Sequence, residues 1–152
     1  MRRFLERGGG WVAGQFVLLA CLVVLALRYP GVGPLAWRCA GALILVIAAA
    51  VAIAGTKALG KNLTPFPEPA ANSRLVQSGI YAKIRHPLYT SVILAGFGWT
   101  LVWLSWPALF AAMALLPFFH AKSCREEGFL RRKFPEYRDY EARTRRFVPG
   151  IY

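Results

Sequence analysis

The sequence predicts an all-α integral membrane protein with about four transmembrane helices and a helical tail on the cytoplasmic side. The 152 residues are enough for one domain and contain four apolar runs. The composition is 57% hydrophobic although the formal net charge is +12, a combination that suits a membrane protein with basic ends. The charges avoid the apolar runs, so this pattern excludes nucleic acid as the expected partner.

The predicted spans cover about residues 11–27, 35–55, 87–104 and 106–120. A transmembrane helix needs about 20 apolar residues, within a range of ~17–25, and the first three runs meet this requirement. The fourth run is short and contains Pro107 and Pro117. We therefore expect it to continue into the polar helix that follows, or to be tilted or kinked. Because the last two runs are almost contiguous, they predict a tight antiparallel hairpin.

The basic residues predict the orientation of these spans. Of the 19 Lys and Arg residues, all but Arg28 and Arg38 fall in the N-terminal tail, the loop 56–86 or the tail 121–152. Cytoplasmic segments of membrane proteins carry such an excess of positive charge. The sequence thus predicts a single membrane domain over 1–152, with both termini and the long loop facing the cytoplasm.

The two cytoplasmic segments have their own local signals. Prolines 65, 67 and 69 predict a stiff, extended stretch in the loop, because proline fixes φ and restricts the residue before it. The tail predicts a helix to Lys133, a break at Phe134-Pro135 and a second short helix to about Thr144. The cysteines show no metal-ligand spacing, so no metal site is expected, and Cys21 and Cys39 are expected to be buried small hydrophobes.

The triplet Arg85-His86-Pro87 marks the start of the third span, because proline suits the first turn of a helix. A helix N-terminus carries free N–H groups and a partial positive charge, so it favours anions. Arg85 and His86 stand just outside it, where they could hold a carboxylate or phosphate. Tyr81 and Tyr89 flank the triplet and offer aromatic faces to a base or a cation. A basic, aromatic anchor in the lipid headgroups is the alternative interpretation.

Two carboxylates, Glu126 and Glu127, follow the fourth span. Adjacent residues of a helix point about 100° apart, so the two can serve different partners. A surface pair between Glu127 and Arg131 is the simpler interpretation. However, the predicted hairpin places the glutamates at the same membrane face as Arg85-His86-Pro87. An anion-binding helix end, aromatic faces and two carboxylates suit a zwitterionic nucleotide-like ligand such as S-adenosylmethionine, and the chain has no G-x-G-x-x-G dinucleotide motif.

These motifs resemble those of the isoprenylcysteine carboxyl methyltransferase and phospholipid methyltransferase superfamily of integral membrane enzymes. The resemblance covers about Lys57 to Tyr152. It rests on Leu75-Val76-x-x-Gly79-x-Tyr81, Arg85-His86-Pro87-x-Tyr89, Glu126-Glu127-x-x-Leu130, Phe134-x-x-Tyr137-x-x-Tyr140, Arg143 and Val148-Pro149. The upstream Leu59-Gly60-x-Asn62-x-Thr64-Pro65 resembles bacterial members, which implies a bacterial inner membrane.

The resemblance implies an S-adenosylmethionine-dependent methyltransferase that acts on a lipophilic or membrane-associated acceptor. It implies a cofactor site near Tyr81, His86, Tyr89 and the two glutamates, to which the residues themselves add Arg85 and Pro87. Arg143 matches an arginine near the reacting end of the substrate, and we assign it the catalytic role. The acceptor could be a thiol, carboxylate, amine or phenol, and the sequence predicts no oligomeric state.

Two other functions compete with this one. Membrane reductases of the sterol type resemble the superfamily in the His-Pro-x-Tyr and C-terminal regions, but they bind NADPH, need more phosphate-binding residues and usually have more spans. A non-enzymatic basic adaptor would recruit anionic lipid or protein partners. It does not explain two carboxylates among so many bases.

Overall fold

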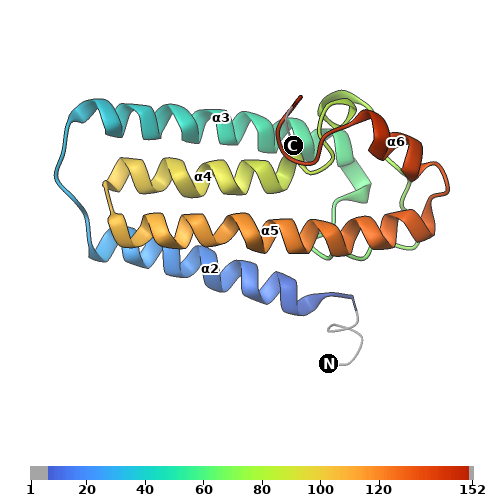
Figure 1. The fold of residues 1–152 in the computed structure, drawn as a ribbon, viewed down its shortest axis with the longest axis horizontal. Helices are drawn as coiled ribbons and strands as arrows, with labels where there is room; N and C mark the ends of the chain where they lie inside the picture. Colours follow the sequence, from blue (N-terminus) through green and yellow to red (C-terminus); the bar gives the residue numbers. More distant parts are fainter. Residues whose placement is uncertain (1–6, 151–152) are drawn as a thin grey trace.

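The computed structural model describes residues 7–150, and within them the predicted all-α fold is confirmed. Figure 1 labels the α-helices, which are α2 (Gly9–Arg28), α3 (Leu35–Leu59), α4 (Pro87–Trp103), α5 (Trp106–Lys133) and α6 (Tyr137–Arg143). Two short 3₁₀ helices, η1 (Gly60–Asn62) and η2 (Gly79–Ala82), lie in the connection between α3 and α4.

The four long helices run alternately up and down (Figure 1). α3 packs along α4, and α2 packs against α5 and α4, so α4 and α5 lie between the other two. At one end of this layer, the loop that follows α3, the short helix α6 and the segment after it gather around the start of α4. That end holds the polar residues that the sequence analysis singled out.

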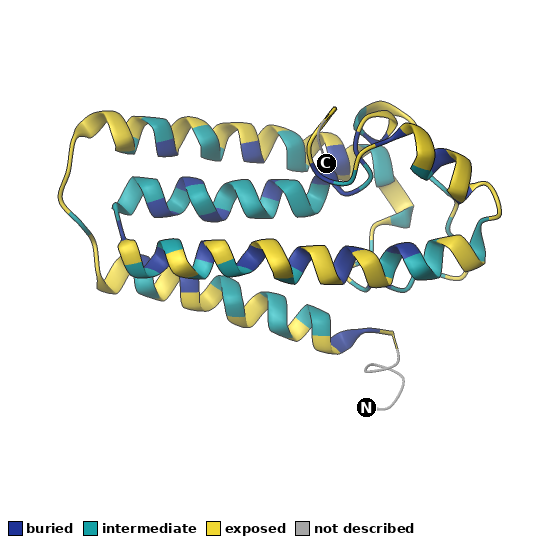
Figure 2. Cartoon of the chain, viewed as in Figure 1, coloured by how far each residue is buried: buried dark blue, intermediate teal, exposed yellow. Residues whose placement is uncertain are grey.

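The long helices have the length and composition of membrane spans. Within residues 7–150, three helices are each long and apolar enough to cross a membrane: α2, α5, and α3 together with η1, which spans Leu35–Asn62. α4 has 17 residues, which is about 26 Å at 1.5 Å per residue, slightly less than the ~30 Å hydrocarbon core of a bilayer. Figure 2 shows many exposed positions along α2, α3 and α5. Large apolar residues occupy many of them, including Phe16, Val17, Val24, Leu43, Val46, Ile47, Phe110 and Met113.

The predicted hairpin between α4 and α5 is confirmed. Leu104 closes α4 in the left-handed conformation with φ 53°, and the Ser105 hydroxyl then accepts a hydrogen bond from the Ala108 N–H at 3.4 Å. α5 continues through Pro117 to Lys133 as one helix, so the expected continuation into the tail is also right. Phe134 ends it and α6 follows, as the sequence predicted.

Small residues allow α3 to lie directly against α4. A Cβ atom added to Gly41 would lie 2.7 Å from the Gly98 carbonyl oxygen, closer than any side chain could be accommodated without a shift of the backbone. Such close approach of two helices is the usual role of small residues in membrane proteins.

The expectation of buried cysteines was wrong. Cys21 in α2 and Cys39 in α3 are both exposed. Because these helices are apolar on all sides, hydropathy does not separate the face that contacts protein from the face that contacts lipid.

Residues 144–147, which follow α6, form a C-terminal strap beside the segment that leads into α4. A parallel bridge joins Ile84 to Arg145. The N–H of Arg85 donates to the Arg145 carbonyl at 2.7 Å, and the N–H of His86 donates to the Arg146 carbonyl at 3.0 Å. The strap therefore fixes the backbone from which Arg85 and His86 project.

Candidate functional site

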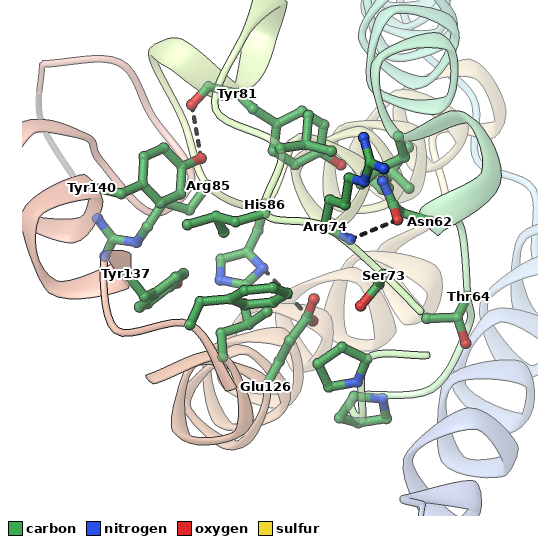
Figure 3. Close-up of a pocket in the computed structure, with 18 of the residues that line it drawn as sticks. Asn62, Thr64, Ser73, Arg74, Tyr81, Arg85, His86, Glu126, Tyr137 and Tyr140 are labelled. Atoms are coloured by element: carbon green, nitrogen blue, oxygen red, sulfur yellow. Dashed lines mark hydrogen bonds and ion pairs between the residues drawn. The ribbon is translucent and has the colours of Figure 1, made fainter. Parts of the chain in front are cut away.

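A cavity of about 110 Å³ lies where the start of α4, α5, the loop after α3, η2 and α6 meet (Figure 3). Aromatic and prolyl rings form much of its wall. Its polar lining residues are Asn62, Thr64, Ser73, Arg74, Tyr81, Arg85, His86, Tyr89, Glu126, Tyr137 and Tyr140. The structure thus brings Tyr81, Arg85, His86, Tyr89 and Glu126 together, as predicted, although Pro87, Glu127 and Arg143 do not line this cavity.

The two adjacent glutamates have different partners. Glu126 faces the cavity, with 27% of its side chain exposed, and lies 3.8 Å from His86 Nδ1. Its carboxylate accepts a hydrogen bond from the Tyr89 hydroxyl. Glu127 points into the protein and is fully buried. The difference follows from the rotation of about 100° between neighbouring residues of a helix.

Glu127 is a buried carboxylate at the centre of a cluster of basic side chains. Its carboxylate accepts hydrogen bonds from Arg85 Nε at 3.0 Å, His86 Nε2 at 3.1 Å and an Arg146 guanidinium nitrogen at 2.6 Å. Arg131 lies 3.6 Å away, so the pair that the sequence suggested exists within this larger cluster. A buried carboxylate is tolerated only when it is paired and hydrogen-bonded in this way. Glu127 therefore holds α5, α4 and the C-terminal strap together.

Arg85 belongs to the same framework. Besides Glu127, its guanidinium donates to the Thr144 carbonyl at 2.7 Å and to the Glu141 carbonyl at 3.1 Å. Its side chain is 8% exposed. Because its Nε and Nη1 atoms bind protein groups, the guanidinium holds this part of the cavity wall in place.

His86 and Tyr89 form a stacked pair at the start of α4. The two rings are 5.2 Å apart with an interplanar angle of 2°. Nε2–H of His86 donates to Glu127, which leaves Nδ1 facing Glu126. The Lys122 ammonium lies 5.1 Å from the centroid of the Tyr89 ring. The same ammonium donates a hydrogen bond to the Gln15 side-chain oxygen of α2 at 2.7 Å. Lys122 is 1% exposed and couples the first membrane helix to this pair, which the sequence analysis did not anticipate.

The tyrosines of the cavity are neutral hydrogen-bonding and stacking groups. Burial raises the pKa of Tyr140 to about 12, although the nearby Arg85 and Arg143 cations oppose the shift. Burial, and then the Glu126 carboxylate, raise the pKa of Tyr81 well above its ordinary value. The Tyr140 hydroxyl donates to the Tyr81 carbonyl at 2.7 Å. A phenolate base is therefore not available from either residue at neutral pH.

Tyr137 differs from these two residues. It is 1% exposed and lines the cavity, yet its hydroxyl is buried without a hydrogen-bond partner in the described part of the chain. An unsatisfied buried hydroxyl is costly and calls for an explanation. Tyr137 and Tyr140 are three residues apart, so the sequence places them on one face of a helix. Neither residue was among those predicted to bind the cofactor.

Arg143 lies outside the cavity. It is the last residue of α6, it is exposed, and its guanidinium donates to Gln77 in the loop before η2. The hydrogen bond between Arg143 and Gln77 therefore links α6 to the loop before η2.

A second groove of about 500 Å³, with an apolar surface, runs between α4 and α5. Its lining residues are Thr90, Ile93, Leu94, Leu116, Pro117, His120, Phe147 and Val148. Phe147 connects the two hollows, because its ring centroid is 6.0 Å from that of His86, which lines the polar cavity.

A sequence model described as phospholipid methyltransferase matches residues 37–137. The match begins in α3, includes every predicted cofactor-binding residue and ends at the first residue of α6, before Arg143. No curated protein matches the chain.

Proposed function

Because the chain belongs to the phospholipid methyltransferase family, we propose that it transfers a methyl group from S-adenosylmethionine to a lipophilic or membrane-associated acceptor. The family makes it a membrane methyltransferase with a lipid-type substrate. The cofactor, the side from which it enters and the residues that hold it are our proposals. One observation carries them: the polar cavity combines a carboxylate, aromatic faces and a buried hydroxyl that has no hydrogen-bond partner within residues 7–150.

The residues of the cavity suit this cofactor chemically. Glu126 offers a carboxylate to an ammonium or a ribose diol, while Tyr81 and Tyr89 offer aromatic surface to a base or a sulfonium. His86 holds the orientation of the Tyr89 ring by stacking. We assign Pro87 and Glu127 a supporting role, since they do not line the cavity. We assign the same role to Arg85, which lines the cavity but is mostly bound to protein groups.

Entry of a ligand of this size requires the cavity to enlarge. Its volume of about 110 Å³ is below the roughly 300–1,000 Å³ of ordinary ligand pockets. The loop that covers it is bounded by Gly60 and Gly79, which have φ values of 51° and 62°. Glycine adopts such positive φ values readily, so these are the positions where the loop can bend.

The apolar groove supports a lipophilic acceptor. It lies between α4 and α5 and is lined in part by Phe147, whose ring centroid is 6.0 Å from that of His86. A hydrocarbon chain in this groove would bring its polar end toward the wall of the cofactor cavity. The groove does not discriminate between a thiol, carboxylate, amine or phenol at that end.

When bound, S-adenosylmethionine would supply an already activated methyl group, so the protein mainly has to align the reactants and exclude water. Buried residues around the start of α4 exclude water here. His86 Nδ1 and Glu126 are the groups that could accept a proton from an amine or thiol acceptor, whereas a carboxylate acceptor needs no base. We keep Arg143 as the residue proposed to orient the acceptor, which would require release of its bond to Gln77.

The test is a titration of the full-length protein, purified in detergent and stripped of co-purified ligand, with S-adenosylmethionine and separately with NADPH. We expect saturable binding of S-adenosylmethionine and methylation of a lipid extract from radiolabelled cofactor. Binding of NADPH alone would favour the reductase. Binding of neither ligand would favour the basic adaptor.

A further inference from the structure

We propose that Arg74, on the loop that covers the cavity, binds the carboxylate of the cofactor's amino-acid moiety. This inference rests on the proposed function, and it assigns a residue that the motifs did not single out. The triplet at the start of α4 suggested that Arg85 would take this role. The structure points to a different cation on the opposite wall.

Most of the Arg85 guanidinium is already bound to protein groups through its Nε and Nη1 atoms. Its guanidinium binds Glu127, the Thr144 carbonyl and the Glu141 carbonyl, and its side chain is almost fully buried. The remaining nitrogen, Nη2, lies 3.9 Å from the Glu141 carboxylate. A ligand carboxylate at this nitrogen would therefore meet a negative charge and disturb a buried charge cluster, which would oppose binding.

Arg74 has the opposite properties. It lines the same cavity and is exposed, and its guanidinium makes no hydrogen bond or ion pair with any residue from 7 to 150. Arginine presents a planar fork of donors that matches a carboxylate. Of the two arginines that line the cavity, Arg74 is the one whose guanidinium is exposed and bonded to no residue from 7 to 150.

The backbone of Arg74 is held in place although its side chain is free. Its N–H donates to the Asn62 side-chain oxygen at 3.0 Å. The preceding residue, Ser73, accepts a hydrogen bond from Lys133 Nζ at 2.8 Å, and this lysine extends from the end of α5. The guanidinium therefore projects from a fixed point at the cavity wall (Figure 3).

The charges across the cavity match a zwitterion. Glu126 is the acid among the lining residues, and it lies on α5, whereas Arg74 lies on the covering loop. Figure 3 shows the two side chains on different walls of the cavity. The amino-acid moiety of S-adenosylmethionine carries an ammonium and a carboxylate on one carbon. An ammonium directed toward Glu126 and a carboxylate directed toward Arg74 would satisfy both residues.

The experiment compares S-adenosylmethionine with its decarboxylated form by calorimetry on the full-length protein. The variants are Arg74→Gln, Arg74→Lys and, as a control for the loss of one cytoplasmic-side charge, Arg138→Gln, which changes an exposed arginine outside the cavity. We expect Arg74→Gln to weaken S-adenosylmethionine about 10- to 100-fold, as for loss of a charge-assisted hydrogen bond. The decarboxylated cofactor should bind this variant and wild type within about twofold, since the group that Arg74 contacts is missing. Arg74→Lys should lie between wild type and Arg74→Gln, and Arg138→Gln should match wild type for both ligands.

Equal losses for the two ligands in Arg74→Gln would overturn the assignment, because they would mean that Arg74 does not recognise the carboxylate. Unchanged S-adenosylmethionine affinity in that variant would overturn it as well. Failure of wild type to bind either ligand would instead overturn the proposed function, and the assignment with it. Each variant's affinity is divided by the wild-type affinity for the same ligand, so the difference in net charge between the two ligands does not enter the comparison.

Discussion

The unpartnered hydroxyl of Tyr137 leads to a prediction with an unusual sign: Tyr137→Phe should stabilise the ligand-free protein and weaken cofactor binding. The hydroxyl is buried on a residue that is 1% exposed, and no group in the described chain bonds to it. A buried polar group without a partner costs about 1–3 kcal/mol, and phenylalanine removes that cost while keeping the ring.

The expected changes in cofactor affinity and in the unfolding midpoint follow from these hydrogen-bond energies. If the ligand supplies the missing acceptor, Tyr137→Phe forfeits one neutral hydrogen bond in the complex, about 0.5–1.5 kcal/mol. Because the same change also relieves the free protein, the affinity for S-adenosylmethionine should fall by about 10-fold or more, at 1.4 kcal/mol per factor of ten. The midpoint of unfolding of the stripped protein should rise by about 2–4 °C for each kcal/mol gained.

Tyr140→Phe is the matched control. Its hydroxyl donates to the Tyr81 carbonyl at 2.7 Å, so this change leaves a buried carbonyl unpaired and should lower the unfolding midpoint. The assay is thermal unfolding of both variants in the same detergent, without and with S-adenosylmethionine, beside binding isotherms. A lower midpoint for ligand-free Tyr137→Phe, or an unchanged cofactor affinity, would refute the reasoning.

Three further predictions concern the glutamates, the topology and Arg143. Glu127→Gln should destabilise the fold by about 3–5 kcal/mol, because it leaves buried basic side chains without their carboxylate partner. Glu126→Gln should instead keep the wild-type unfolding midpoint and lose cofactor affinity. Similar unfolding midpoints for the two variants in denaturation curves would contradict these different roles. Val32→Cys and Asn72→Cys, in a cysteine-free background, should be labelled from opposite sides of the membrane by an impermeant reagent, and labelling from one side would contradict the four-span arrangement. Arg143→Lys should lower single-turnover methyl transfer while leaving cofactor affinity nearly intact, and wild-type turnover would remove Arg143 from the proposed catalytic role.

Several features were predictable from the sequence because they depend on local chemistry. The apolar runs predict the helices, since a membrane helix satisfies its own backbone hydrogen bonds. Pro87 predicts the first residue of α4, and the near-contiguous last two runs predict the hairpin. Together these bring Tyr81, His86, Tyr89 and Glu126 to one cavity, as the motifs suggested.

Other features depend on contacts between distant segments, and the sequence left them open. Whether Glu126 or Glu127 faces the cavity depends on the rotation of α5 against α4 and the strap, which no apolar pattern specifies at a polar helix end. Whether an arginine is available to a ligand depends on carbonyls about sixty residues away, such as that of Thr144 for Arg85.

The sequence by itself thus determined which segments are helices, which end of the bundle is polar and which residue types gather there. Only the tertiary structure decided that Arg85 and Glu127 are bound within the protein, and that Glu126 faces the cavity. It also decided that the Arg74 guanidinium and the Tyr137 hydroxyl have no hydrogen-bond partner among the described residues, and we propose that these groups bind the ligand. The physical reason is that a helix or a turn is specified by neighbours along the chain, whereas the free hydrogen-bonding capacity of a side chain is what remains after every distant partner has been counted.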